Sequence, residues 1–288
     1  LSNLGRLLTR PISVVRVPSP DGVHGPVDGL AEAIDEQTAL VTLSHTVFKS
    51  GYTYDMAAIT KMAHQAGALT LWDLSHAVGA TTVNLNESQA DLAVGCTYKY
   101  LNGGPGAPAF LYVREDLQSK MRNPITGWFS HSDMFNFELD FASSDNMRRY
   151  MTGTPPMLSL LAVEPGVDLT VEAGMEKLRA KSMQQTDYLI RLWEAVLEPL
   201  GFRLNSPREA ARRGSHVSLG HDLGLPIDLA LLNEMNVLPD LREPHNIRLG
   251  IAPLYNTFEE IYSAVFRLKQ VVDEKRYEKY MDVAVDVT

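Results

Sequence analysis

The sequence predicts an α/β protein with a mostly parallel sheet covered by helices on both faces, followed by a smaller α+β domain. Two observations support this prediction. Before residue 120, short apolar runs alternate with segments of helical spacing, a pattern typical of parallel sheets covered by helices. From residue 174 onward, a long amphipathic segment precedes shorter strand-like and helical segments. We therefore divide the chain into a large domain over residues 1–173 and a small domain over residues 174–288.

Each expected element of the large domain follows from the spacing of its apolar residues. Strands are expected at Ser13–Val17, Thr38–Leu43, Ala68–Trp72, Asp91–Cys96 and Ala109–Val113. Helices are expected at Val27–Ile34, with Asp28 as cap, at Asp55–Gln65 and at Met157–Val171. Between the last strand and the last helix, residues 125–154 lack a regular pattern and are expected to form long loops.

The spacing of apolar residues also predicts the elements of the small domain, which follow a different order. Its expected helices are Met175–Leu200, Pro226–Met235, Phe258–Val272 and a charged tail at Asp273–Tyr280. Its expected strands are Gly201–Leu204, His216–Leu219 and Asn246–Ile251. This mixture predicts an α+β arrangement.

Composition excludes several classes of protein. The 288 residues carry a net charge of −9 and no stripe of basic residues, which argues against a nucleic-acid-binding protein. The single cysteine, Cys96, rules out an internal disulfide, so we expect a cytoplasmic protein. No apolar run reaches the length of a membrane span, and the histidines lack metal-binding spacing. The first residues lack an initiator Met, and we expect the chain to begin within a longer protein.

Polar side chains gather where the expected strands end, which is the edge of a parallel sheet where ligands bind. Ser44, Asp73, His76 and Lys99 all follow such strands, so one site can hold them. A lysine at the end of a buried strand suits a Schiff base with a cofactor aldehyde. An aspartate at a neighbouring strand end suits the protonated pyridine nitrogen of pyridoxal 5'-phosphate (PLP). The residues alone therefore point to PLP, with a structural lysine and a capping aspartate as the plainer alternatives.

Five motifs, taken together, resemble the kynureninase family of PLP-dependent enzymes. They are D-L-S-H-A at 73–77, Y-K-Y-L-N-G-G-P-G at 98–106, G-W-F at 127–129, G-T-P at 153–155 and I-R-L-G-I-A-P-L-Y-N at 247–256. The resemblance implies fold type I, the PLP-dependent transferase-like fold. It also implies a homodimer that shares its active sites, in tryptophan catabolism and NAD biosynthesis.

The resemblance also implies a role for each matching residue at the centre of the site. Lys99 would form the Schiff base and then move protons on the substrate, and Tyr98 would contact the phosphate and pass a proton to the substrate carbon. Asp73 would pair with the pyridine nitrogen, and His76 would lie beside the ring or phosphate. Core packing is the alternative for Tyr98 and His76.

Four further positions match the family at the edge of the site. Ser44 matches a hydroxyl near the cofactor, and Trp128 and Thr154 match positions that hold the phosphate, partly from the neighbouring subunit. Arg248 matches the arginine that binds the substrate α-carboxylate, for which a planar guanidinium is well suited. Loop packing or a surface ion pair is the alternative in each case, and Arg242 is assigned a structural role.

The resemblance implies a hydrolase that cleaves the Cβ–Cγ bond of L-kynurenine or 3-hydroxykynurenine, giving anthranilate or 3-hydroxyanthranilate and L-alanine. Kynureninases hold the cofactor phosphate at a helix N-terminus that precedes the matching region, and nothing in residues 1–10 corresponds to it. Two alternatives therefore stay open. One is another class V PLP enzyme, such as an aminotransferase or desulfurase, and the other is an inactive kynureninase fragment.

Overall fold

The computed structural model describes residues 12–283 and contains two four-stranded sheets. The first sheet has the order β1 (Leu40–Ser44), β2 (Leu69–Asp73), β3 (Leu92–Cys96) and β4 (Ala109–Val113). The β1–β2 and β2–β3 pairs are parallel and β3–β4 is antiparallel, so the predicted mostly parallel sheet is confirmed. Its strands lie within two residues of their predicted bounds because each is a short apolar run between polar residues.

Helices cover both faces of this sheet, as predicted. On one face, α2 (Met56–Gln65) is capped by Asp55 and packs on Trp72, whose indole N–H donates to Thr60 at 3.2 Å. Nearby, α1 (Val27–Ala33) follows Pro26 and has no side-chain cap, so the expectation for Asp28 is wrong. The other face packs against α3 (Glu115–Gln118) and the 3₁₀ turn η3 (Met147–Tyr150).

One predicted strand does not form. Residues 13–17 are almost wholly exposed and belong to neither sheet. A strand requires a partner for its backbone N–H and C=O groups, and no strand among residues 12–283 pairs with this segment. An apolar run by itself therefore gave the wrong prediction at this point.

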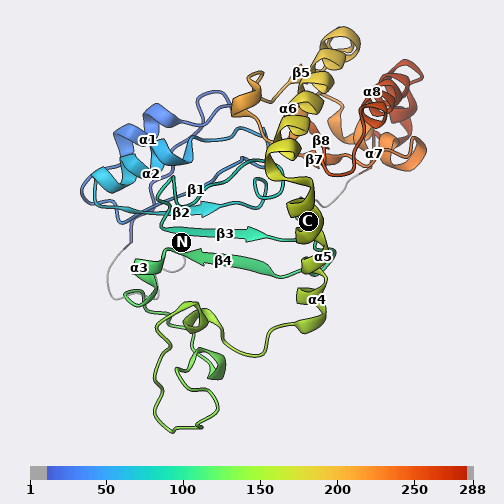
Figure 1. Ribbon diagram of the computed structural model, residues 1–288. Coiled ribbons are helices and arrows are strands. Elements are labelled where there is room, and N and C mark those ends of the chain that lie inside the picture. Colours follow the sequence, from blue (N-terminus) through green and yellow to red (C-terminus); the bar gives the residue numbers. More distant parts are fainter. Residues whose placement is uncertain (1–11, 284–288) are drawn as a thin grey trace.

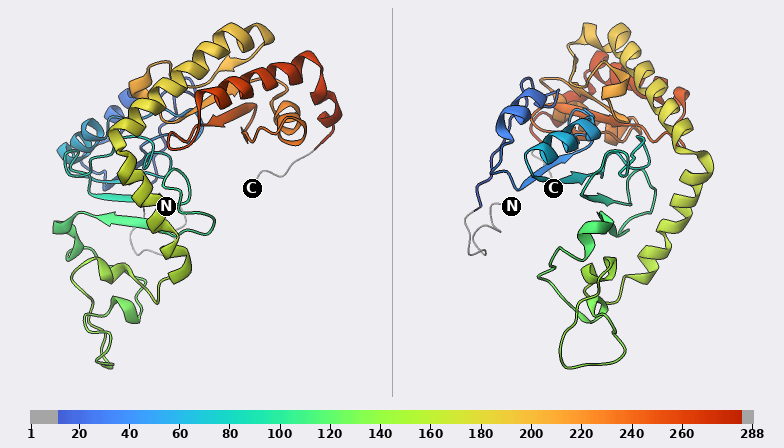
Figure 2. Two further views of the ribbon diagram at one scale, coloured as in Figure 1. Left: turned by 45° about the vertical axis from the view of Figure 1, so that its right-hand side comes forward. Right: turned by 60° about the vertical axis from the view of Figure 1, so that its left-hand side comes forward.

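Residues 119–156 form a long excursion with little regular structure apart from η3 and η2 (Trp128–Ser130), as the sequence predicts. Figure 1 shows this green segment extending away from the C-terminal sheet. The chain then returns through α4 (Met157–Leu161) and α5 (Val163–Ala173). Both views in Figure 2 show these helices passing the first sheet and leading into α6 (Met175–Leu192).

The second sheet is antiparallel and has the order β5 (Arg203–Leu204), β6 (His216–Gly220), β8 (Asn246–Gly250) and β7 (Asp240–Arg242). It packs against α6, α7 (Gly224–Glu234) and α8 (Phe258–Asp273) around Trp193, Leu219 and Ile247. The predicted helix to Leu200 changes form after Leu192, first to a π-helical turn, η4 (Trp193–Leu197), and then to a 3₁₀ turn, η5 (Glu198–Leu200). Two short 3₁₀ turns, η6 (Ala210–Arg212) and η7 (Arg276–Tyr280), complete this part.

Candidate active site

The carboxyl edge of the first sheet brings together the polar residues that end β1 and β2. Because these strands are parallel and in register, Ser44 lies opposite Asp73, and Asp73 lies opposite Val94 of β3. One oxygen of Asp73 accepts a hydrogen bond from the backbone N–H of Ser75 at 2.8 Å, which fixes the carboxylate. Its second oxygen has no hydrogen-bond partner among residues 12–283 and stays available to a ligand.

The loop after β3 carries Lys99 and is held from two sides. Gly79 has a φ of +85°, and a Cβ at that position would lie 2.6 Å from the carbonyl oxygen of Tyr100. Gly166 of α5 contacts the backbone of the same loop at Leu101. Only residues without a side chain allow these approaches, so the two glycines fix the position of the lysine.

Lys99 itself is half-buried and has no hydrogen bond or ion pair within the described part of the chain. Its Nζ lies 5.5 Å from the centre of the half-exposed Tyr98 ring. Lys99 is therefore free to react with a ligand.

His76 lies among the charged residues of the site. Burial, together with the positive charges of Lys99, Arg248 and Arg242, lowers the pKa of His76 to about 4, while Asp73 acts in the opposite direction. The imidazole is therefore neutral near pH 7 and can accept a hydrogen bond. Its Nε2 lies 3.2 Å from Nη1 of Arg248. Four predicted site residues therefore lie near one another: His76, Asp73, Lys99 and Arg248.

Arg248 reaches this point from β8 of the second sheet. Its Nε donates to Asp240 at 2.7 Å and its Nη2 donates to the other oxygen of the same carboxylate. Its Nη1 donates to the carbonyl oxygen of Phe48, in the loop after β1, at 2.6 Å. A second link between the sheets comes from Tyr100, whose hydroxyl donates to the carbonyl oxygen of Ser215 at 3.0 Å, and burial raises the pKa of this hydroxyl.

Trp128 and Thr154 lie in the excursion and not beside His76. Trp128 is half-exposed and packs on Phe129 and Phe135, with ring centres 4.5 and 6.2 Å apart. Thr154 is exposed, and the backbone at Gly127 lies against Thr152, so the two loop motifs are neighbours. Figure 1 shows the excursion that carries both residues extending away from the second sheet, in which Arg248 lies.

Sequence reasoning missed several residues of the cluster around Arg248. Asp240 and Arg242 lie in β7, which was not predicted, and Asp240 lies opposite Arg248 in the hairpin. The alternation in Asp-Leu-Arg before the turn at residues 243–245 was the available signal. His216 is fully buried, with its ring 5.8 Å from that of His76, and no local pattern indicates its place.

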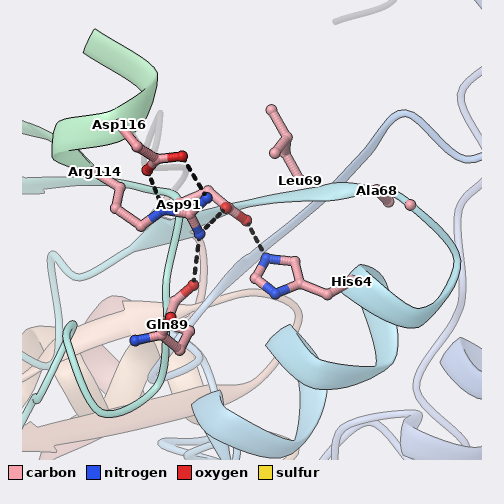
Figure 3. A pocket seen from close by; sticks show the side chains of 8 residues that line it. His64, Ala68, Leu69, Gln89, Asp91, Arg114 and Asp116 are labelled. Carbon is pink, nitrogen blue, oxygen red and sulfur yellow. Dashed lines mark hydrogen bonds and ion pairs between the residues drawn. The ribbon is translucent and has the colours of Figure 1, made fainter.

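A pocket of about 610 Å³ lies at the opposite, amino edge of the sheet (Figure 3). Its buried carboxylate, Asp91, contacts Arg114 at 2.6 Å, His64 at 2.8 Å and the backbone N–H of Thr70 at 2.7 Å. These partners use both oxygens of Asp91. We conclude that this cluster joins α2, β2 and β3 to the segment after β4 and is not the reactive site.

Among residues 12–283, no three side chains of the types that ligate metals gather in one place. No helix in this range combines the length and the apolar character needed to cross a bilayer.

Comparison with known proteins supports the family that the motifs indicate. Residues 178–268 match the family model of the kynureninase C-terminal domain. A kynureninase of Pseudomonas fluorescens is 44% identical over 248 residues, which are 86% of this chain and 59% of that protein. A kynureninase of Burkholderia mallei is 38% identical over 88% of this chain and 61% of its own length. The chain thus spans about three-fifths of the length of these relatives.

A solved structure supports the fold. Cysteine desulfurase from Thermococcus onnurineus NA1 superposes with a TM-score of 0.79 at 18% identity, covering 95% of this chain and 69% of the other. Likeness at this level of identity establishes the fold alone, which is the predicted fold type I. This fold agrees with the sequence comparison, in which the chain resembles kynureninases along about three-fifths of their length.

Proposed function

We propose that the site around His76 is the active site of a PLP-dependent hydrolase of the kynureninase type. Its substrate would be L-kynurenine or 3-hydroxykynurenine, and its products anthranilate or 3-hydroxyanthranilate and L-alanine. The observation that carries the proposal is the convergence of Lys99, Asp73 and Arg248 on His76 from separate elements. We further propose the division at residue 174, which the separate cores of the two sheets support.

The available groups of the site fit PLP. Lys99 offers an unpaired amine, and Asp73 offers one free carboxylate oxygen on the neighbouring strand. An aldehyde requires the first group and a protonated pyridine nitrogen requires the second. When bound, the cofactor supplies an electron sink for the carbanion chemistry at the substrate α-carbon.

The residues of this chain would then divide the remaining tasks. Lys99 would take the α-proton of the substrate and return protons later in the cycle. Tyr98, whose ring adjoins Lys99, delivers a proton to the β-carbon when the Cβ–Cγ bond breaks. Neutral His76 and Ser44 line the same edge and orient the bound groups by hydrogen bonds.

Arg248 would bind the α-carboxylate of the substrate. Its guanidinium is largely buried and faces the charged cluster from the second sheet. A planar guanidinium binds a carboxylate through two parallel hydrogen bonds, which fixes the direction of the substrate as well as its charge. This contact would place the α-carbon near Lys99.

A homodimer would bring Trp128 and Thr154 to the site of the partner subunit, where they would hold the phosphate. Support comes from the apolar side chains that the excursion and α4 expose to solvent, because patches of this kind mark interaction surfaces. They are Ile125, Phe135, Phe137, Leu139, Phe141, Met157, Leu158, Leu160 and Leu161. Within the proposal, the protein is cytoplasmic and takes part in tryptophan catabolism.

Borohydride reduction of the PLP-loaded protein, followed by peptide mapping, tests the cofactor assignment. We expect one reduced adduct, on Lys99, and no specific adduct on any lysine in Lys99→Ala. Lys61→Ala, which changes an exposed lysine of α2, is the matched control and should keep the adduct on Lys99. Labels spread over surface lysines would contradict the proposal and favour an inactive fragment.

A substrate panel tests the reaction class. We expect release of anthranilate from L-kynurenine and no release of sulfide from L-cysteine. A desulfurase needs a nucleophilic cysteine on a mobile loop, whereas Cys96 lies within β3 with its thiol 3.7 Å from the carbonyl oxygen of Ser75. Amino-group transfer to a keto acid, without anthranilate, would favour the aminotransferase alternative.

A further inference from the structure

The partners of Arg248 indicate how the guanidinium is prepared for a ligand. Arginine has five N–H donors, one on Nε and two on each terminal nitrogen. Asp240 takes the Nε–H and one N–H of Nη2, which form the side edge of the guanidinium. The two N–H groups of Nη1 face the carbonyl oxygen of Phe48 and Nε2 of His76. One N–H of Nη2 is left without a partner within the described part of the chain.

The free N–H lies on the end edge, formed by Nη1 and Nη2. A carboxylate that binds this edge through two parallel hydrogen bonds uses the free N–H and displaces one of the two partners of Nη1. Asp240 holds the adjoining side edge, through Nε and the other N–H of Nη2, and need not move. The geometry therefore separates a permanent contact, with Asp240, from an exchangeable contact, with Phe48 or His76.

Further charged groups lie around Arg248. Asp240 is shared with a second arginine, because Nη2 of Arg242 donates to it at 3.0 Å. The guanidinium of Arg242 also lies 6.0 Å from the centre of the Phe48 ring. Two guanidinium groups thus share one carboxylate, and neutral His76 adds no charge. Arg248 and Arg242 carry one positive charge more than Asp240 alone balances, and Asp228, which interacts with Asp240 and Arg242, is a further carboxylate beside them.

We propose that Asp240 is the positioning residue of the carboxylate-binding arginine: it fixes the side edge of Arg248 so that the end edge faces the substrate carboxylate. This inference rests on the proposed function, in which Arg248 binds that carboxylate. Asp240 does not touch the substrate. It acts through Arg248, whose long side chain would otherwise lose conformational freedom on binding and weaken the contact.

The first test needs no cofactor. In an NMR spectrum of ¹⁵N-labelled protein, the Nε–H resonance of Arg248, assigned by its loss in Arg248→Lys, should be sharp and protected from exchange. Asp240→Asn should broaden or remove this resonance while other arginine resonances persist, and Asp240→Glu should restore it in part. Asp222→Asn is the matched control, because Asp222 is an exposed carboxylate paired with Arg203 at 2.8 Å in the same domain. An unchanged Arg248 resonance in Asp240→Asn would overturn the proposal.

The second test measures the carboxylate contact by titration calorimetry of PLP-loaded protein with L-alanine and with L-alaninamide, which lacks the carboxylate. Asp240→Asn should bind L-alanine about tenfold more weakly, a loss typical of one impaired charge-assisted pair, and L-alaninamide with unchanged affinity. Tighter or equal binding of L-alanine by Asp240→Asn would mean that Asp240 competes for Arg248, and the proposal would be wrong. If the parent protein binds neither compound, the proposed function fails, and the arginine resonance alone decides the role of Asp240.

Discussion

Both edges of the first sheet carry a carboxylate and a cation, but these groups are paired at the amino edge and only partly paired at the carboxyl edge. At the amino edge, Asp91 is fully buried and both of its oxygens are paired, with Arg114, His64 and Thr70 (Figure 3). At the carboxyl edge, Asp73 keeps one free oxygen and Lys99 has no partner among residues 12–283. A carboxylate and a cation at strand ends are therefore insufficient to identify a site. Unsatisfied groups distinguish the edge that binds ligands from the edge that holds the fold together.

The largest expected loss of stability follows from a substitution at the amino edge, Asp91→Ala. Asp91→Ala leaves Arg114 and the backbone N–H of Thr70 without their buried partner, and such a loss costs about 3–5 kcal/mol of unfolding free energy. Asp73→Ala removes a single hydrogen bond, to the backbone of Ser75, and should cost about 1 kcal/mol. Urea unfolding of both variants measures the difference. Equal losses at the two positions would contradict the comparison.

Histidines at the carboxyl edge predict a pH dependence of stability. Burial lowers the pKa of His45 and of His76 from 6.5 to about 4, so the folded state favours the neutral imidazole. The unfolded chain takes up protons first as the pH falls, so stability is complete above pH 6.5 and is lost between pH 6.5 and 4. Each histidine should contribute about 1–2 kcal/mol of this loss at pH 5.

Unfolding free energies at pH 7 and pH 5 check this expectation. In His76→Gln the loss between the two pH values should be smaller than in the parent protein, because a group that titrates only in the unfolded state has been removed. A parent protein with equal stability at the two pH values would show that these histidines are accessible to protons in the folded state.

Much of the sheet and part of the site follow from sequence because they depend on local patterns. Short apolar runs ending in Ser44, Asp73 and the Lys99 loop predict parallel strands, and parallel strands bring their carboxyl ends to one edge. Local patterns do not predict which distant segments pair. Residues 13–17 have a strand-like pattern but no partner, whereas Asp240–Arg242 has a weak pattern but pairs with β8.

The site residues that sequence reasoning missed depend on the same distant pairing. Asp240 meets Arg248 because the two lie opposite each other in a hairpin, and His216 meets His76 across the two sheets. No spacing along the chain encodes these contacts. Arg242, expected to have a structural role, lies beside Asp240 and Phe48, and its position there could not be read from the sequence.

Gly79→Ala sharpens the comparison by disturbing the reactive loop without touching its charges. The added Cβ would lie 2.6 Å from the carbonyl oxygen of Tyr100, at a φ of +85° that side chains rarely adopt. We expect a loss of about 2 kcal/mol in unfolding free energy and a lower yield of the borohydride adduct on Lys99. Gly67→Ala is the matched control, because it has a similar φ of +81° and no atoms within 4 Å of the added Cβ. A full adduct yield in Gly79→Ala would show that this contact does not position the lysine.

The smallest expected effect on stability concerns Lys99. Because its amine has no partner among residues 12–283, Lys99→Met removes no hydrogen bond or ion pair there. The unfolding free energy should therefore change by no more than about 0.5 kcal/mol, while the borohydride adduct is lost. Lys99 would then be needed for the adduct but not for stability, whereas Asp91 is needed for stability. A loss of 2 kcal/mol or more, on the scale of a removed buried partner, would show that Lys99 is held by contacts in the fold and would remove the basis for treating the two edges as different.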